Sequence, residues 1–171
     1  MGEITVRAAV VGDAGAVLDL HVRARSTVYR GFLGEDELAR DNRRDVADYE
    51  RMITRSDRVV RCALISGGLV GFVVVGPPYY PDPDPAVRGE LYQIQVDPAH
   101  FGRGIGTRLH AAALEVWRGT ADTVRLWAWE FNERGRRFYR RHGWEHDGHC
   151  RPDDPRIGRY RMLGYRLAVT H

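Results

Sequence analysis

A chain of 171 residues is the size of one domain, because a single hydrophobic core serves up to about 250 residues. Its 43% hydrophobic and 29% charged content is typical of a globular protein, and no apolar run approaches the roughly 20 residues of a membrane span. The net charge of +3, from 26 basic residues that are all arginine and 23 acidic residues, is too small to indicate nucleic-acid binding. We therefore expect one domain over residues 1–171 that binds neither nucleic acid nor membrane.

The two cysteines indicate a reducing compartment. Cys62 and Cys150 lie far apart in the sequence, and residues 1–10 lack the charged and apolar regions of a secretory signal peptide. We expect a cytoplasmic protein with both thiols free.

The first half of the chain combines helical and strand patterns. Asp13 is the expected N-cap of the first helix, and the pair Gly67-Gly68 suits the tight turn of a hairpin. In chain order, the patterns predict a strand at 4–7, a helix from Asp13 to a break at Gly31, a helix from about Glu35 to Ile53, and strands at 59–65 and 69–75.

The second half alternates strands with helices. Asn132 is expected to cap the last helix, and Gly143 to follow its end as the C′ residue. The predicted elements are a proline-rich loop at 76–89, a strand at 90–96, a helix at about 104–117, a strand at 123–129, a helix at 132–142, a strand at 144–146, a polar loop at 147–156 and a strand at 159–167. This order is typical of an α/β domain with a mixed sheet.

A glycine-rich turn, Phe101 to Thr107, separates a strand from a helix. Glycines allow the backbone to approach a ligand, and the N–H groups and positive partial charge of a helix start favour a phosphate or pyrophosphate. Arg103 and Arg108 could add charge-assisted hydrogen bonds. The glycines could equally serve the geometry of the turn alone.

Two familiar nucleotide motifs do not fit this turn. A P-loop requires a lysine before the final Ser or Thr, and Ile105-Gly106-Thr107 contains none. A dinucleotide fingerprint requires its third glycine at Thr107 and an acidic residue at the end of the next strand, whereas Asp122 precedes that strand.

A different pair of motifs does match. Val96-Asp97-Pro98 precedes the glycine-rich turn, and Asn132, Phe138-Tyr139 and Gly143-Trp144 follow in order after the next strand. In this the chain resembles the GNAT superfamily of N-acetyltransferases over nearly its whole length. It departs from the family pattern at Phe101, where the family most often has Gln or Arg.

The resemblance implies a GNAT fold: a mixed central sheet of about six or seven strands, splayed at the central strand and flanked by about four helices. It also implies acetyl-CoA as co-substrate. A bulge near Ile94 to Val96 would splay the strands, so that pantetheine lies between them and a backbone N–H there holds the acetyl carbonyl. The residues expected at the cofactor are Ile94, Gln95, Val96, Phe101, Gly102, Arg103, Gly104, Ile105, Gly106, Thr107, Asn132, Phe138 and Tyr139.

Acetyl transfer requires an acid for the departing thiolate and a base for the amine. Tyr139 is the expected general acid, because a phenol is protonated at neutral pH. Glu90 is the candidate base at the start of the central strand. Tyr139 could instead be a packing residue of its helix, and Glu90 an ordinary strand-end charge.

The acceptor is a small-molecule amine or a peptide or protein amine. The residues expected to contact it are Tyr29, Tyr79, Tyr80 and Trp127. His146, His149 and Cys150 form the closest set of metal-ligand types, and without further ligands we expect no metal. A CoA-binding sensor with little turnover, transfer to a hydroxyl, a longer acyl donor and a homodimer all remain open.

Overall fold

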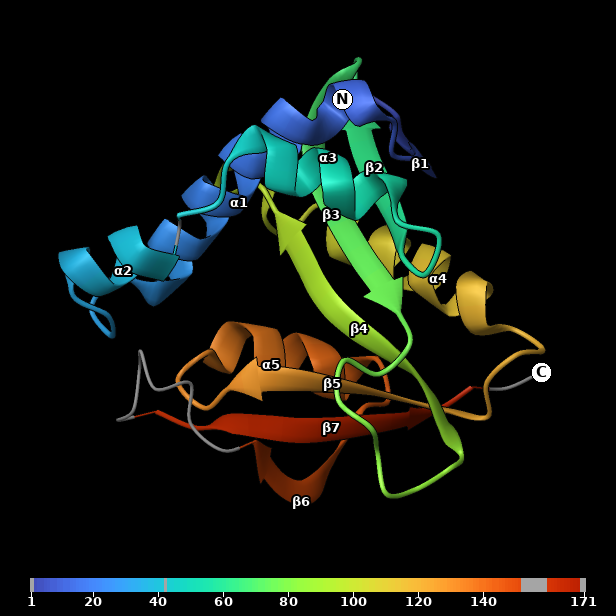
Figure 1. Cartoon of the computed structure of the whole chain (residues 1–171). Helices are drawn as coiled ribbons and strands as arrows, with labels where there is room; N and C mark the ends of the chain where they lie inside the picture. Colours follow the sequence, from blue (N-terminus) through green and yellow to red (C-terminus); the bar gives the residue numbers. More distant parts are fainter. Residues whose placement is uncertain (1, 42, 152–159, 170–171) are drawn as a thin grey trace.

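The computed structural model describes residues 2–41, 43–151 and 160–169, which form one seven-stranded sheet with helices on both faces. The sheet order is β1-β2-β3-β4-β5-β7-β6, parallel between β4 and β5 and antiparallel elsewhere (Figure 1). The strands are β1 Ile4–Ala8, β2 Val59–Ile65, β3 Gly68–Gly76, β4 Val87–Val96, β5 Thr123–Trp129, β6 Glu145–Arg151 and β7 Met162–Ala168. The helices are α1 Ala14–Tyr29, α2 Glu35–Asp41, α3 Val46–Thr54, α4 Ile105–Trp117 and α5 Glu133–Arg141, with single 3-10 turns at Val11–Asp13 and Pro98–His100. Among these described helices, none has the length and apolar character to cross a membrane.

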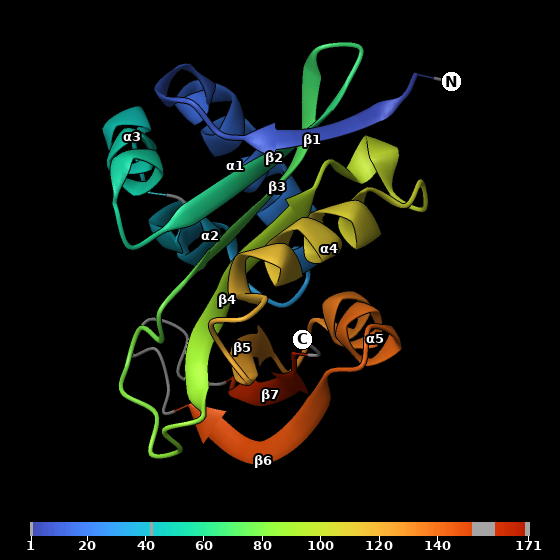
Figure 2. The same cartoon turned by 90° about the vertical axis from the view of Figure 1, so that its right-hand side faces the viewer.

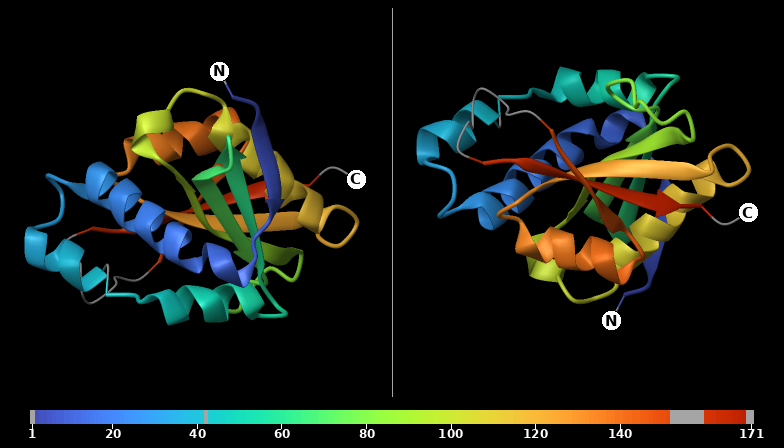
Figure 3. Two further views of the ribbon diagram at one scale, coloured as in Figure 1. Left: turned by 90° about the horizontal axis from the view of Figure 1, so that it is seen from above. Right: turned by 90° about the horizontal axis from the view of Figure 1, so that it is seen from below.

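The two faces of the sheet carry separate helices, because alternate residues of a strand point to opposite sides. Phe72 and Val74 pack with Leu20 of α1 and Tyr49 of α3 in one cluster, whereas Val73 packs on the other face, in the cluster that contains α4. Figures 2 and 3 show α1, α2 and α3 on one side of the sheet and α4 and α5 on the other. The predicted mixed sheet flanked by helices is confirmed.

The sheet divides where β4 and β5 part. Their pairing ends at Leu91 and Leu126, and beyond it β4 continues with β3 alone while β5 continues with β7 alone. Figure 1 shows the two strands diverging toward their carboxyl ends. The predicted splay is therefore present among the described strands.

A β-bulge on β4 accompanies this fork. Val75 pairs with Leu91 and Val74 with Gln93, so that Tyr92 is the extra residue. A bulge bends its strand and increases the local twist, which turns β4 away from β5. The bulge was expected near Ile94 to Val96 and lies two residues earlier, at the apex of the fork.

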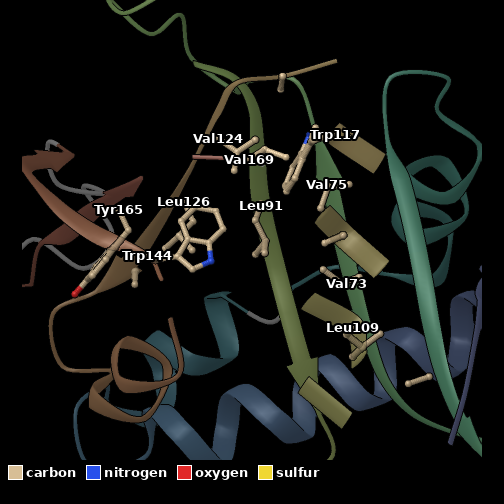
Figure 4. Close-up of a cluster of buried hydrophobic side chains, with 14 of the residues drawn as sticks. Val73, Val75, Leu91, Leu109, Trp117, Val124, Leu126, Trp144, Tyr165 and Val169 are labelled. Atoms are coloured by element: carbon tan, nitrogen blue, oxygen red, sulfur yellow. The ribbon is translucent and has the colours of Figure 1, made fainter. Parts of the chain in front are cut away.

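The base of the fork is held by the larger core cluster. Leu91 and Leu126, the last pair, lie in one cluster with Trp144, which is 1% exposed (Figure 4). At the open end, α1 reaches across: its last residue, Tyr29, packs with Trp129 and Phe131 beyond the end of β5. The strands are thus held together at the base of the fork, and α1 covers the end of β5.

One predicted helical feature of the first half of the chain was wrong. The helix expected from Glu35 to Ile53 is two helices, because Asp45 starts α3 with a capping box: its Oδ1 accepts the Asp48 N–H at 2.9 Å, and its own N–H donates to Asp48. Asp13 is the N-cap residue of α1, as expected, although its carboxylate accepts hydrogen bonds from the Val10 N–H and from Arg7 and makes none to the helix.

Near the other end of the chain, the predicted end of the last helix is confirmed, and one predicted strand was too short. Gly143 follows α5 with a φ of +84°, the left-handed conformation expected of a C′ residue. β6 extends to Arg151, where a loop was expected from 147, because residues 150 and 151 pair again with β7 after an irregularity. The remainder of that predicted loop, 152–156, lies outside the described residues.

Gly71 of β3 provides a stability test, because it lies under α4 where space is short. A Cβ there would lie 2.9 Å from Leu109 Cδ1 and 3.0 Å from Gln95 O. We expect Gly71→Ala to lower the free energy of unfolding by about 1–3 kcal/mol in urea denaturation. Gly15→Ala in α1, where a Cβ would meet nothing within 4 Å, should raise it by roughly 0.5–1 kcal/mol. Equal effects of the two variants would contradict this packing.

Candidate active site

The glycine-rich turn has the backbone geometry of an anion site. Gly102 and Gly104 have φ values of +79° and +77°, and Gly104 is the N-cap of α4. Such residues turn successive N–H groups toward one point, and the first turn of a helix adds N–H groups without intrahelical partners. Arg103 and Thr107 are exposed at the same place. The turn is therefore suited to a phosphate or pyrophosphate.

Helix α5 packs directly on this turn. A Cβ on Gly106 would lie 3.1 Å from Phe138 Cε2, so the absence of a side chain at 106 allows the Phe138 ring to approach α4. Phe101 lies under the guanidinium of Arg134, 3.7 Å from the ring centroid. Arg108 instead donates to the Ile4 carbonyl at 3.1 Å, so its guanidinium is directed to β1 and not to the turn.

The free edge of β4 leads from this turn to the apex of the fork. Ile94, Gln95 and Val96 pair with β3 on one side and, lying beyond the last β4–β5 pair, have no ladder partner on the other. The turn from Phe101 to Thr107 follows the end of the strand. An extended ligand with an anionic end can therefore follow one continuous path along β4.

Tyr139 projects from α5 at the base of the fork. Asn132 caps this helix, its Oδ1 accepting the Gly135 N–H at 2.9 Å. Tyr139 packs against the core cluster that contains Leu91 and Leu126. Burial first, and then the neighbouring Tyr29 phenol, raise the pKa of Tyr139 well above its usual value. The phenol is therefore protonated at neutral pH.

A cleft of about 1700 Å³ opens on the opposite face, beside α3. Tyr79 and Tyr80 of the proline-rich loop line it, as does Trp127 of β5. The fourth predicted acceptor contact, Tyr29, is not among the lining residues: it is 8% exposed within an aromatic cluster. Three of the four predicted contacts thus share one cleft, and Tyr29 lies near Tyr139 instead.

Glu90 lines the same cleft and is bound to the protein through one oxygen. Its Oε2 accepts the Arg125 Nε–H and the Tyr79 N–H, each at 2.9 Å, and its side chain is 5% exposed. Arg125 also donates to Asp82 at 2.8 Å and to the Tyr80 carbonyl at 2.6 Å. The predicted base is therefore one member of a buried ion-pair network.

This network was not predicted from the sequence. Arg166 of β7 extends it, donating to Asp82, Asp84 and Asp147 at 2.8–3.0 Å. Together with Arg125 it attaches the proline-rich loop to the sheet. The only sequence signal was the alternation of Asp and Pro at 82–85, which gives no indication of the arginine partners.

The histidines take structural roles. His110 accepts the Trp144 indole N–H at 2.9 Å, and His21 contacts Gln93 at 3.0 Å, next to the bulge. His146 contacts the Gly164 carbonyl at 2.7 Å. Within the described residues, no three His, Cys, Asp or Glu side chains gather as a metal site would require.

Comparisons with known proteins agree with this geometry. A family model described as an acetyltransferase (GNAT) domain matches residues 56–146. An uncharacterized N-acetyltransferase of Archaeoglobus fulgidus is 33% identical over 124 residues, which cover 71% of this chain and 82% of the relative.

Solved structures show the same fold at low sequence identity. The PaiA N-acetyltransferase of Thermoplasma acidophilum, solved in complex with coenzyme A, is similar with a TM-score of 0.80 at 17% identity, over 97% of this chain and 99% of that one. A ribosomal-protein-alanine N-acetyltransferase from Brucella melitensis has a TM-score of 0.74 at 21% identity, over 96% and 99% of the two chains.

The fold and the family match define an acyltransferase built on the GNAT architecture. The chain belongs to the GNAT superfamily of N-acetyltransferases, which confirms the family expected from its motifs. Its co-substrate is acetyl-CoA, the acyl donor of that family.

The buried His110 predicts a pH dependence of stability. Burial, and then the nearby His142, lower the pKa of His110 to about 4, whereas an unfolded histidine titrates near 6.5. Between these values the unfolded chain binds a proton that the folded chain excludes, so the free energy of unfolding should fall as the pH falls from about 6.5 to 4. His110→Gln should reduce that slope by up to about 1.4 kcal/mol per pH unit, measured by denaturation at several pH values. An unchanged slope would contradict a neutral, buried His110.

Proposed function

We propose that this protein transfers an acetyl group from acetyl-CoA directly to an amine of a small molecule or peptide. The observation that carries the proposal is the fork between β4 and β5: the glycine-rich turn follows the end of β4, and the 1700 Å³ cleft is lined by Leu91 and Tyr92 at the apex. A donor can enter from the turn and an acceptor from the cleft. Because the two meet at the apex, no covalent enzyme intermediate is needed.

The donor is assigned to the turn and the free edge of β4. The N–H groups from Phe101 to Thr107 would hold the pyrophosphate, and Ile94 to Val96 would pair with pantetheine as an added strand. Asn132 and Phe138 support this site through the cap of α5 and the packing on Gly106. Because the bulge lies at Tyr92, we place the acetyl carbonyl nearer the apex than Ile94, where the bulged backbone would supply its hydrogen bond.

The transfer has a simple balance of bonds. The amine nitrogen attacks the thioester carbon, the C–N bond forms, and the C–S bond breaks as the tetrahedral intermediate collapses. The amine loses a proton to a base, and the thiolate of CoA gains one from Tyr139. Because its pKa is raised, the Tyr139 phenol is protonated at neutral pH and can donate a hydrogen bond to the departing sulfur. The proton is transferred only as the negative charge on sulfur develops, and the phenolate then regains a proton from water.

Glu90 is the proposed base, because it lies in the cleft one residue before the last β4–β5 pair. Its Oε2 already accepts two hydrogen bonds, so Oε1 would receive the proton directly or through a water. Tyr79, Tyr80 and Trp127 would contact the acceptor from the cleft walls.

Acetyl transfer is tested by release of free CoA thiol from acetyl-CoA with a panel of amines. We expect Tyr139→Phe to lower kcat by about 10²- to 10⁴-fold, because it removes the general acid, with little change in the affinity for CoA. Tyr165→Phe is the matched control: it removes the same atom from a neighbouring ring whose hydroxyl is bound to Arg136.

Two results would contradict this assignment. Full activity in Tyr139→Phe would exclude its role as the acid. If CoA raised the melting temperature of the wild type but no amine gave turnover above hydrolysis, the chain would be a CoA-binding module of the kind left open by the sequence.

The role of Glu90 is tested by comparing two partners of Arg125. Glu90→Gln should lower kcat/KM by about 10²-fold or more if Glu90 is the base. Asp82→Asn also removes one carboxylate from Arg125, but Asp82 lies in the loop and not on β4. If both variants lose the same activity and the same stability, Glu90 acts only by holding Arg125.

A further inference from the structure

The cleft beside α3 carries more positive than negative charge. Its lining residues in the described chain include eight arginines and four carboxylates. Each of the four carboxylates already accepts an arginine: Asp48 binds Arg51, Asp82 and Glu90 bind Arg125, and Asp147 binds Arg166. None of these four carboxylates is therefore the partner of Arg58, another of the lining arginines.

Arg58 is the arginine placed best for such a ligand. Its guanidinium lies 3.8 Å from the centroid of the Tyr92 ring and 5.9 Å from that of Tyr79. Its side chain is 14% exposed, and its buried Nε has no hydrogen-bond partner among the residues that the structure describes. The Asp57 carboxylate lies 3.9 Å away, beyond hydrogen-bond distance, and accepts two bonds from Arg55 at 2.7 Å. The hydrogen-bonding capacity of this guanidinium is therefore not used up within the described chain, and a guanidinium is a preferred partner of carboxylate and phosphoryl oxygens.

Two further arginines add to the field at this end of the cleft. Arg25 and Arg44 both line it. Burial first, and then the positive charges of these two arginines, lower the pKa of the adjacent His21 to about 3. His21 contacts Gln93, the residue after the bulge, so the positive potential extends to the apex of the fork.

We propose that the acceptor is a compact amine that also carries an oxyacid anion, a carboxylate or a phosphoryl group, bound by Arg58 beside Tyr92. This inference rests on the proposed acetyl transfer. Tyr92 is the bulged residue at the apex, and Arg58 stacks on its ring. An anion bound to Arg58 would therefore be separated from the β4 backbone by about the length of a tyrosine side chain. A molecule of amino-acid size can therefore place its amine at the thioester and its anion on Arg58. A polycationic amine would be repelled by the same charges.

The experiment compares matched acceptors in the CoA-release assay. The panel contains free amino acids, their carboxamides, their decarboxylated amines, aminoalkylphosphonates of similar length, and spermidine. We expect kcat/KM to be about 10- to 100-fold higher for an acid than for its amide, because a charge-assisted hydrogen bond is lost in the amide. The phosphonates separate a phosphoryl from a carboxylate preference. Arg58→Gln should reduce the acid-to-amide ratio toward one.

Arg118→Gln is the matched control. It removes the same charge from an exposed arginine after α4 that pairs with Glu115, and it should leave the ratio unchanged. A preference for amides or spermidine, or a ratio that survives in Arg58→Gln, would overturn the anionic acceptor and leave acetyl transfer intact.

A second measurement decides the matter if no amine releases CoA, a result that would count against the proposed function itself. Titration calorimetry of the same acids into the protein–CoA complex then reports on the anion site directly. Binding to the wild type that is lost in Arg58→Gln supports the site, and no binding to the wild type overturns it.

Discussion

β4 and β5 separate after Leu91, and the two faces of the candidate active site are arranged around this separation. A parallel pair buried between helices would ordinarily continue its hydrogen bonds to the strand ends. Here the extra residue Tyr92 twists β4 away, while Leu91, Leu126 and Trp144 keep the two halves of the sheet together at the base. The cost is a row of unpaired backbone groups on β4, and a ligand that hydrogen-bonds along that edge compensates for it.

The two sides of the fork are built by different physical means. The proposed donor side is largely backbone: positive-φ glycines, a helix start and a strand edge, with the Phe138 ring packed on Gly106. The proposed acceptor side is made of side chains, mostly arginines, aromatic rings and carboxylates in ion pairs. Backbone recognition suits one invariant ligand, whereas side chains can be exchanged without disturbing the sheet. This explains why the donor can be assigned from the family and the acceptor cannot.

The proline-rich loop is an ordered wall of the cleft and not a flexible cover. Arg125 and Arg166 bind its carboxylates and one of its carbonyls, with the side chains of Arg125 and Asp82 each 5% exposed. Buried ion pairs of this kind contribute little net stability, since desolvation offsets most of the attraction. Their effect is positional, because they fix Tyr79 and Tyr80 relative to the fork. The carboxylates in these pairs are bound to Arg125 and Arg166 and do not neutralise Arg58.

Features whose residues lie within a few positions of one another could be predicted from the sequence. The turn from Phe101 to Thr107, the Asn132 cap and Gly143 at the end of α5 follow from local backbone requirements, and the pairing of motifs identified the family. The capping box at Asp45 is an equally local signal, and a prediction that included it would separate α2 from α3. Which charged side chains form ion pairs could not be predicted in this way, because it depends on the fold. Glu90 and Arg125 are 35 residues apart, and Asp82 and Arg166 are 84 apart. Their contact depends on the register of three strands, which no local pattern encodes. For the same reason, residue type did not predict that Tyr29 lies outside the lining of the cleft or that Arg58 stacks on Tyr92. Strand pairing and helix packing determine which side chains lie together.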